Sequence, residues 1–212
     1  MELPQLIGSA WPGLTEEQIA GVVRFHTLLA KENEIQNLTR MISPEAFVEG
    51  HLLDVKELLG TGFLEFPAAD LGSGPGVPGL LAGVLRPDAW VLIESEQRKA
   101  EFLRKSSQEL GLPLVQVFAD RAEKVMDRAK ARSVVARAVG SVDKIYGWIR
   151  KSSTWNSLIL LKGPGWDEEW KAFHHTQLGR ELRITGSHSY TVGPEAKRRV
   201  IIKLSRVPRG TK

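Results

Sequence analysis

The chain has 212 residues, enough for one α/β domain with a modest extension, and its 42% apolar and 25% charged residues fit a soluble fold with a hydrophobic core. The absence of cysteine excludes disulfides, thiolate nucleophiles and cysteine-ligated metal centres. The net charge of +4 favours polyanionic partners only mildly, and neither a signal-peptide pattern nor an apolar run near the ~20 residues of a membrane span is present. We therefore expect a cytoplasmic protein.

The first sixty residues are predicted to be helical. Thr15 and Gln18 have the spacing of a capping box, and apolar residues at helical intervals follow them. A second helical segment covers 43–60, with proline at its favoured first position and glycine at its end. We expect residues 1–62 to be a helical extension packed on a core domain formed by residues 63–212, the two parts making a single compact unit.

From residue 63 onward, predicted strands and helices alternate. The strands are expected at 64–70, 89–94, 114–118, 133–137 and 157–162, and the helices at 78–86, 96–110, 121–130, 141–151 and 167–179. This alternation builds a mostly parallel sheet with helices on both faces. The segments 181–192 and 198–206 have no helix between them and are predicted to pair antiparallel, which completes seven strands. Five parallel strands followed by an antiparallel pair resemble the Rossmann-like fold of class I methyltransferases.

A glycine-rich stretch, 70–79, joins the first strand of this series to the next helix and reads Asp-Leu-Gly-Ser-Gly-Pro-Gly-Val-Pro-Gly. Glycines at 72, 74 and 76 permit positive φ angles and place no Cβ against a ligand. The pattern resembles the loop that holds S-adenosylmethionine in class I methyltransferases.

The same stretch also fits a second motif. Gly74 to Gly79 matches the dinucleotide fingerprint G-x-G-x-x-G, with Glu94 at about the expected distance of ~20 residues. In that register two prolines fall inside the motif and Gly72 has no role. An oxidoreductase that uses NAD or FAD therefore remains the functional alternative. A tight turn without any ligand is the purely structural alternative.

Acidic residues follow the next two predicted strands. Glu94 ends the strand 89–94, where an acid can accept hydrogen bonds from both ribose hydroxyls of an adenosine. It could instead cap the helix that begins near Glu96. Ala122 and Glu123 follow the third strand and would lie beside the adenine, although acids are also common in the first turn of a helix.

Two cations follow the last two parallel strands. Arg137 leaves an apolar strand at the edge where open α/β sheets bind ligands, and it could contact a carboxylate or an RNA phosphate. A structural ion pair is the alternative. Lys162 occupies the matching position at the end of 157–162.

Polar residues outside the sheet provide further candidates. His51 and Asp54 are three residues apart on the second predicted helix and could face the cleft together, or could form a solvated or helix-stabilising pair. A basic region that could contact phosphates or be a solvated surface comprises Lys197, Arg198, Arg199, Arg206, Arg209 and Lys212.

The combined motifs resemble the bacterial 16S rRNA guanine-7 methyltransferases, a family first called glucose-inhibited division protein B. The resemblance rests on Asn37-Leu38-Thr39, His51-Leu52-Leu53-Asp54, the glycine-rich stretch, Ala122-Glu123, Ala136-Arg137-Ala138 and Leu161-Lys162-Gly163. It implies S-adenosylmethionine as cofactor, a guanine in the decoding-region loop of 16S rRNA as substrate, the small ribosomal subunit as partner, and no metal. We also expect a monomer. A protein of this fold that binds RNA without activity is a further alternative.

The resemblance also assigns residues. The implied cofactor contacts are Gly72, Val77, Ala122, Glu123 and Arg137. With the loop and strand-end residues Asp70, Ser73, Gly74, Gly76 and Glu94, they make up the expected cofactor site. We expect the RNA contacts at Asn37, His51, Lys162, Arg198 and Arg199. Arg137 and Lys162 would position the reactants, and no general base is expected, because N7 of guanine carries a lone pair and no proton. At position 94 the family usually has aspartate, so the longer glutamate is a departure.

Overall fold

The computed structural model describes residues 1–207, and these contain one seven-stranded sheet in the order β3-β2-β1-β4-β5-β7-β6. Its strands are β1 (Ala68–Leu71), β2 (Trp90–Ile93), β3 (Gln116–Phe118), β4 (Ser133–Arg137), β5 (Ser157–Lys162), β6 (Leu182–Val192) and β7 (Lys197–Arg206). Strands β1 to β5 are parallel, whereas β7 is antiparallel to both β5 and β6. The predicted class I methyltransferase fold, with its closing antiparallel pair, is confirmed.

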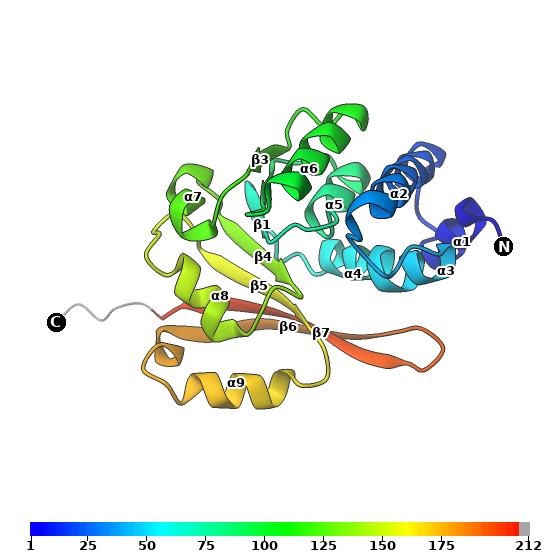
Figure 1. Ribbon diagram of the computed structural model, residues 1–212. Helices are drawn as coiled ribbons and strands as arrows, with labels where there is room; N and C mark the ends of the chain where they lie inside the picture. Colours follow the sequence, from blue (N-terminus) through cyan, green and yellow to red (C-terminus); the bar gives the residue numbers. More distant parts are fainter. Residues whose placement is uncertain (208–212) are drawn as a thin grey trace.

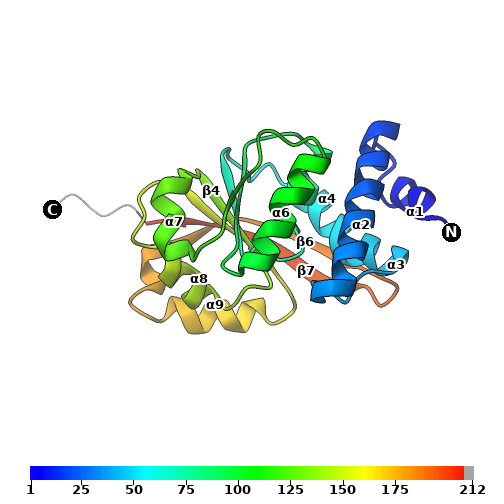
Figure 2. The same ribbon diagram turned by 45° about the horizontal axis from the view of Figure 1, so that its top comes forward.

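Helices cover both faces of the sheet (Figure 1). They are α1 (Leu3–Ala10), α2 (Glu16–Gln36), α3 (Pro44–Phe47), α4 (Leu53–Gly60), α5 (Gly79–Leu85), α6 (Gln97–Glu109), α7 (Ala122–Ala129), α8 (Val142–Ile149) and α9 (Trp166–His174), with a 3₁₀ turn at Gly179–Glu181. One apolar core lies under α2, α4, α5 and α6, and the other lies under α7, α8 and α9. Figure 2 shows α2 running beside α6, so the N-terminal helices pack on the same face as the first crossover helices.

The N-terminal helices depart from the prediction in one informative place. The capping box at Thr15 and Gln18 is confirmed, because each side chain bonds to the other residue's backbone N–H. The segment 43–60, however, is not one regular helix, since a π-helical turn at Val48–Leu52 separates α3 from α4. Such turns insert extra residues into a helix and are frequent at functional sites. This turn carries His51.

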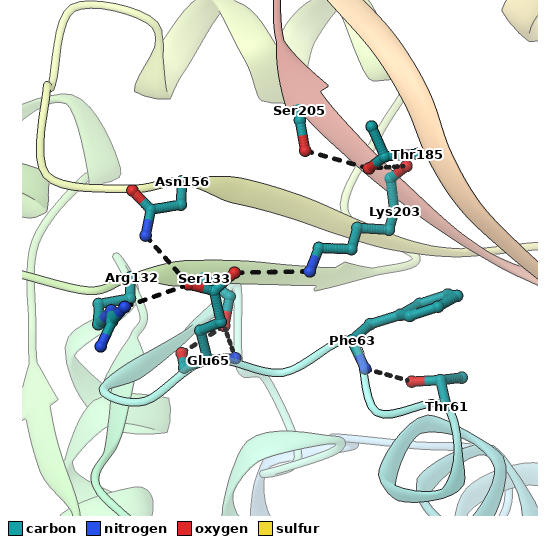
Figure 3. Close-up of polar contacts among 9 residues, drawn as sticks. All are labelled: Thr61, Phe63, Glu65, Arg132, Ser133, Asn156, Thr185, Lys203 and Ser205. Carbon is teal, nitrogen blue, oxygen red and sulfur yellow. Dashed lines mark hydrogen bonds and ion pairs between the residues drawn. The ribbon is translucent and has the colours of Figure 1, made fainter.

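The first strand begins later than predicted. Residues 64–67 precede β1 as an irregular segment, which Glu65 ties to the amino-terminal ends of other strands (Figure 3). Its backbone N–H and carbonyl bond to the Ser133 hydroxyl at 3.0 and 2.6 Å. Its carboxylate accepts a hydrogen bond of 3.0 Å from Asn156 and lies 3.5 Å from the Lys203 ammonium. The Asn156 hydrogen bond, aided by the charge of Lys203, lowers the pKa of Glu65.

Within residues 1–207, no helix is both long and apolar enough to cross a membrane. The same residues contain no group of three or more histidine, aspartate or glutamate side chains arranged to hold a metal ion.

Candidate active site

The glycine-rich loop between β1 and α5 adopts backbone angles that side chains rarely tolerate. Gly72, Gly74 and Gly76 have φ angles of +68°, +47° and +85°. At Gly72 an added Cβ would also lie only 2.9 Å from a methyl carbon of Val139. Glycine is therefore required at these positions for the conformation predicted from sequence, and at Gly72 for close approach as well.

Two side chains predicted to contact the cofactor instead support the loop from beneath. Asp70 is almost fully buried and accepts a 2.9 Å hydrogen bond from the Gly79 N–H, while the buried Ser73 hydroxyl donates to the Asp70 carbonyl at 2.9 Å. Burial raises the pKa of Asp70 to about 6, with the Gly79 hydrogen bond and the charge of Arg137 acting in the opposite direction. The Asp70 carboxylate and the Ser73 hydroxyl thus bond inside the protein, and contact of these two residues with the cofactor stays a prediction.

Glu94 connects the glycine-rich loop to the next crossover. One carboxylate oxygen accepts from the Gly74 N–H at 2.9 Å, and the other accepts from the Glu96 N–H at 2.9 Å. The second bond supports the alternative in which Glu94 organises the start of α6. A carboxylate has about four acceptor positions, so ribose hydroxyls can still bond to Glu94 beside these two backbone groups.

A pocket of about 330 Å³ opens at the carboxyl ends of β1, β2 and β3, and we call it the first pocket. It is lined by Leu71, Gly72, Ile93, Ser95, Asp120, Arg121, Ala122, Glu123, Val139 and Trp148. Among the predicted cofactor residues, Gly72, Ala122 and Glu123 line it. Gly74 and Gly76 shape the loop behind it, the Val77 side chain is buried in the apolar core, and contact of these three residues with the cofactor stays a prediction. Sequence reasoning missed Trp148, which the crossover helix α8 brings to this edge.

A second pocket of about 310 Å³ lies at the carboxyl ends of β4 and β5, and we call it the second pocket. It is lined by Met41, Asp54, Arg137, Ala138, Gly140, Leu161, Lys162, Gly163, Tyr190 and Arg199. These residues come from the N-terminal helices, two parallel strands and the C-terminal hairpin. Their charged members are the ones that the sequence had singled out at separate positions along the chain.

The two pockets share the short segment that follows β4. Val139 lines the first pocket, whereas Ala138 and Gly140 on either side of it line the second. Ala138 has a φ angle of +57°, a left-handed conformation that costs roughly 1–2 kcal/mol for a non-glycine residue. Strained residues of this kind cluster at functional sites. The segment therefore forms a common wall between the two pockets.

Arg137 is held in the second pocket rather than in the first. Its guanidinium donates to the Gly50 carbonyl at 2.6 Å and to the Asp54 carboxylate at 2.9 Å, and it lies 2.8 Å from Nδ1 of His51. Only 12% of the side chain is exposed. Arg137 therefore forms the structural ion pair that was the alternative to a ligand contact. It does not line the first pocket, so the predicted contact with the cofactor has no support there.

His51 does not reach the surface. The residue is fully buried, and its Nε2 lies 3.1 Å from the Thr39 hydroxyl. Burial, and next the charge of Arg137, lowers the pKa of His51 to about 3, so the ring is neutral and can accept from Arg137 through Nδ1. The predicted RNA contact by His51 is corrected, since both ring nitrogens face the protein interior. The solvated His51–Asp54 pair is also wrong, because Asp54 is buried too.

The remaining predicted RNA residues lie in different environments. Lys162 is largely buried and donates to the Gly140 carbonyl at 2.9 Å and to Glu169 at 2.7 Å. Asn37 is exposed and ends α2 with a φ angle of +51°. Arg198 is exposed and Arg199 half-buried, whereas Arg209 and Lys212 lie outside the described residues.

The strand order, the glycine-rich loop and the paired pockets at the strand ends together define a class I methyltransferase. A family model described as rRNA small subunit methyltransferase G matches residues 18–189. A ribosomal RNA small subunit methyltransferase G from Rhodopirellula baltica is 39% identical over 172 residues, which cover 79% of this chain and 74% of that protein. One from Nitrosomonas europaea is 34% identical over 191 residues, 85% of each chain. The chain belongs to the rRNA small subunit methyltransferase G family, as its motifs predicted.

Solved structures agree on the fold. The chain resembles a mutant of MtNAS in complex with S-adenosylmethionine, with a TM-score of 0.57 and 19% identity over 86% of this chain and 73% of that one. It also resembles a putative RNA methyltransferase from Pyrococcus horikoshii, with a TM-score of 0.54 and 15% identity over 87% of this chain and 98% of that one.

Proposed function

We propose that this protein transfers a methyl group from S-adenosylmethionine to N7 of a guanine in the decoding-region loop of 16S rRNA. The observation that carries the proposal is the pair of pockets on either side of residues 138–140, in a chain of the rRNA small subunit methyltransferase G family. A methyl transfer needs a cofactor and an acceptor held side by side with water excluded, and two adjoining pockets provide that arrangement.

The first pocket fits the cofactor. Its volume of about 330 Å³ is at the lower end of the roughly 300–1,000 Å³ typical of small-molecule sites. Gly72 leaves the pocket wall free of a side chain, while Ala122 and Glu123 line its far side. Glu94 does not line the pocket but lies between the lining residues Ile93 and Ser95 and bonds to the Gly74 N–H, so we propose it for the ribose hydroxyls; Trp148 provides an aromatic surface. Bound there, S-adenosylmethionine supplies an electrophilic methyl group.

The second pocket is the proposed site of the guanine. N7 of guanine needs no deprotonation before it accepts a methyl group, so the protein has to hold the base and exclude water rather than move a proton. The polar groups of this pocket are consistent with that requirement, because Asp54 and Lys162 are already paired inside the protein. Arg137 and Lys162 are then positioning residues on either side of the base.

The flanking RNA is proposed to follow the charged surface beside this pocket. Arg199 lines the pocket, and the exposed Arg198 precedes it on β7, so both can contact phosphates. Asn37 lies exposed at the end of α2. We propose that the protein acts as a cytoplasmic monomer on the small ribosomal subunit or its precursor, without a metal ion.

The deciding experiment is transfer of labelled methyl groups to rRNA, followed by nucleoside analysis. The expected product is 7-methylguanosine in 16S rRNA, and a different nucleoside would refute the proposed site of methylation. Isothermal titration with S-adenosylmethionine and with NAD tests the cofactor directly. Binding of NAD alone would support an oxidoreductase, whereas RNA binding without methyl transfer would indicate an inactive RNA-binding protein.

A further inference from the structure

Asp54 lies at the centre of a group of buried polar side chains beside the second pocket. Its carboxylate is only 4% exposed. One oxygen accepts from Arg137 of β4 at 2.9 Å, and the other accepts from the Tyr190 hydroxyl at 2.7 Å and from the guanidinium of Arg199. One side chain of α4 is thus bonded to three strands of the sheet, β4, β6 and β7.

The paired charges around this pocket leave one net positive charge. Lys162 is neutralised by Glu169, and His51 is neutral because of its burial beside Arg137. The guanidinium groups of Arg137 and Arg199 therefore share the single negative charge of Asp54. Without that carboxylate, two unbalanced guanidinium groups would face the pocket.

The proposed reaction makes the balance important. As the bond from the methyl carbon to N7 forms, its bond to sulfur breaks and the electron pair of that bond stays on sulfur. The positive charge consequently moves onto the purine, and no proton leaves to offset it. Positive charge developing beside two guanidinium groups is unfavourable, and a carboxylate in a site sheltered from water reduces that penalty.

We propose that Asp54 is a positioning residue that balances charge in the second pocket: it fixes Arg137 and Arg199 and offsets their charge, so that the bound purine can become a cation. The inference rests on the proposed function. It assigns to Asp54 a role that neither acid–base chemistry nor cofactor binding requires.

The test compares the kinetics of methyl transfer by the wild type and by Asp54→Asn, a change that keeps the shape and removes the charge. We expect kcat to fall about 100-fold, while the KM for small-subunit RNA is unchanged or lower because the pocket becomes more positive. Cofactor affinity, measured by isothermal titration, should be unchanged. The matched control is Glu57→Gln, which removes another carboxylate of α4 whose partner, His188, lies 2.7 Å away on β6. Its kcat should stay within about twofold of the wild type.

The double variant Asp54→Asn/Arg199→Gln separates charge from structure. Because it removes one cation along with the anion, it should recover at least about tenfold of the lost kcat, and no recovery would overturn the proposal. Equal losses of kcat, cofactor affinity and RNA affinity in Asp54→Asn would overturn it as well. If Asp54→Asn does not fold, the single variant Arg199→Gln tests the inference instead. Its KM for RNA should rise and its kcat should exceed that of the wild type. A kcat at or below the wild-type value would refute the inference. Failure of the proposed function is distinguishable, because the wild type itself would then not methylate rRNA.

Discussion

Replacing Gly72 by alanine tests the link between the backbone of the glycine-rich loop and the first pocket. An alanine at a φ angle of +68° costs roughly 1–2 kcal/mol. The new Cβ would lie 2.9 and 3.1 Å from two methyl carbons of Val139, and overpacking of this kind costs about 1–3 kcal/mol. The free energy of unfolding should therefore fall by about 3 kcal/mol, which lowers the melting temperature by roughly 6–12 °C in a protein of this size.

The same change should damage cofactor binding. Gly72 and Val139 both line the first pocket, so relief of the clash moves one wall of that pocket. We expect the Kd for S-adenosylmethionine to rise at least about tenfold, which corresponds to about 1.4 kcal/mol of binding free energy. Isothermal titration measures this change, and thermal unfolding without ligand measures the stability.

Gly111 provides the matched control. Its φ angle of +67° is almost the same, but an added Cβ would meet no atom within 4 Å, and Gly111 does not line the first pocket. Gly111→Ala should therefore lose about 1–2 kcal/mol of stability and keep its cofactor affinity. The double variant Gly72→Ala/Val139→Ala should recover part of the affinity lost by Gly72→Ala. Equal cofactor affinities of Gly72→Ala and the wild type would refute the reasoning.

Three further predictions concern single charged residues. Burial raises the folded-state pKa of Asp70 to about 6, so ionisation of this carboxyl destabilises the fold as pH rises through that value. Above pH 6, the variant Asp70→Asn should therefore be more stable than the wild type by up to about 3 kcal/mol. Urea titrations measure this difference, which should vanish near pH 4. The pKa of Glu65 is lowered, so its ionised carboxylate stabilises the fold above its unfolded-state pKa, and this stabilisation is lost as pH falls. The variant Glu65→Gln should lower the free energy of unfolding by about 1 kcal/mol at pH 7 and hardly change it at low pH, as measured by acid unfolding. The variant Arg137→Ala should lose methyl transfer. Its circular dichroism spectrum should stay native, because Arg199 and Tyr190 still bond to Asp54. Normal turnover by this variant on small ribosomal subunits would contradict the role of Arg137.

The parts of the fold that the sequence predicts are those with local causes. Strands β4 and β5 coincide with the predicted 133–137 and 157–162, because each is an apolar run that leads directly into a cation. The positive φ angles of the glycine-rich loop were likewise predictable, since only glycine tolerates them at low cost. The late start of β1 was not, because Glu65 is held by partners 68 or more positions further along the chain.

The division of the site into two pockets also depends on distant contacts. Arg137 was expected at the sheet edge and is there, but its partners His51 and Asp54 lie 86 and 83 positions away. The π-helical turn that carries His51 has no simple pattern in the sequence, so neither its burial nor its bond to Arg137 could be foreseen. Trp148 was missed because an aromatic residue on a crossover helix usually packs in the core.

The N-terminal helices contribute side chains to the apolar core that supports the site, so we expect residues 1–62 and 63–212 to fold as a single unit. Phe25, Leu52 and Leu58 are fully buried in the same apolar cluster as Leu81 and Trp90. Each such side chain contributes about 1.5–3 kcal/mol, and a whole domain is stable by only about 5–15 kcal/mol. A chain that begins at residue 63 should therefore show no cooperative unfolding transition by circular dichroism, whereas a cooperative transition in that fragment would establish an independent domain.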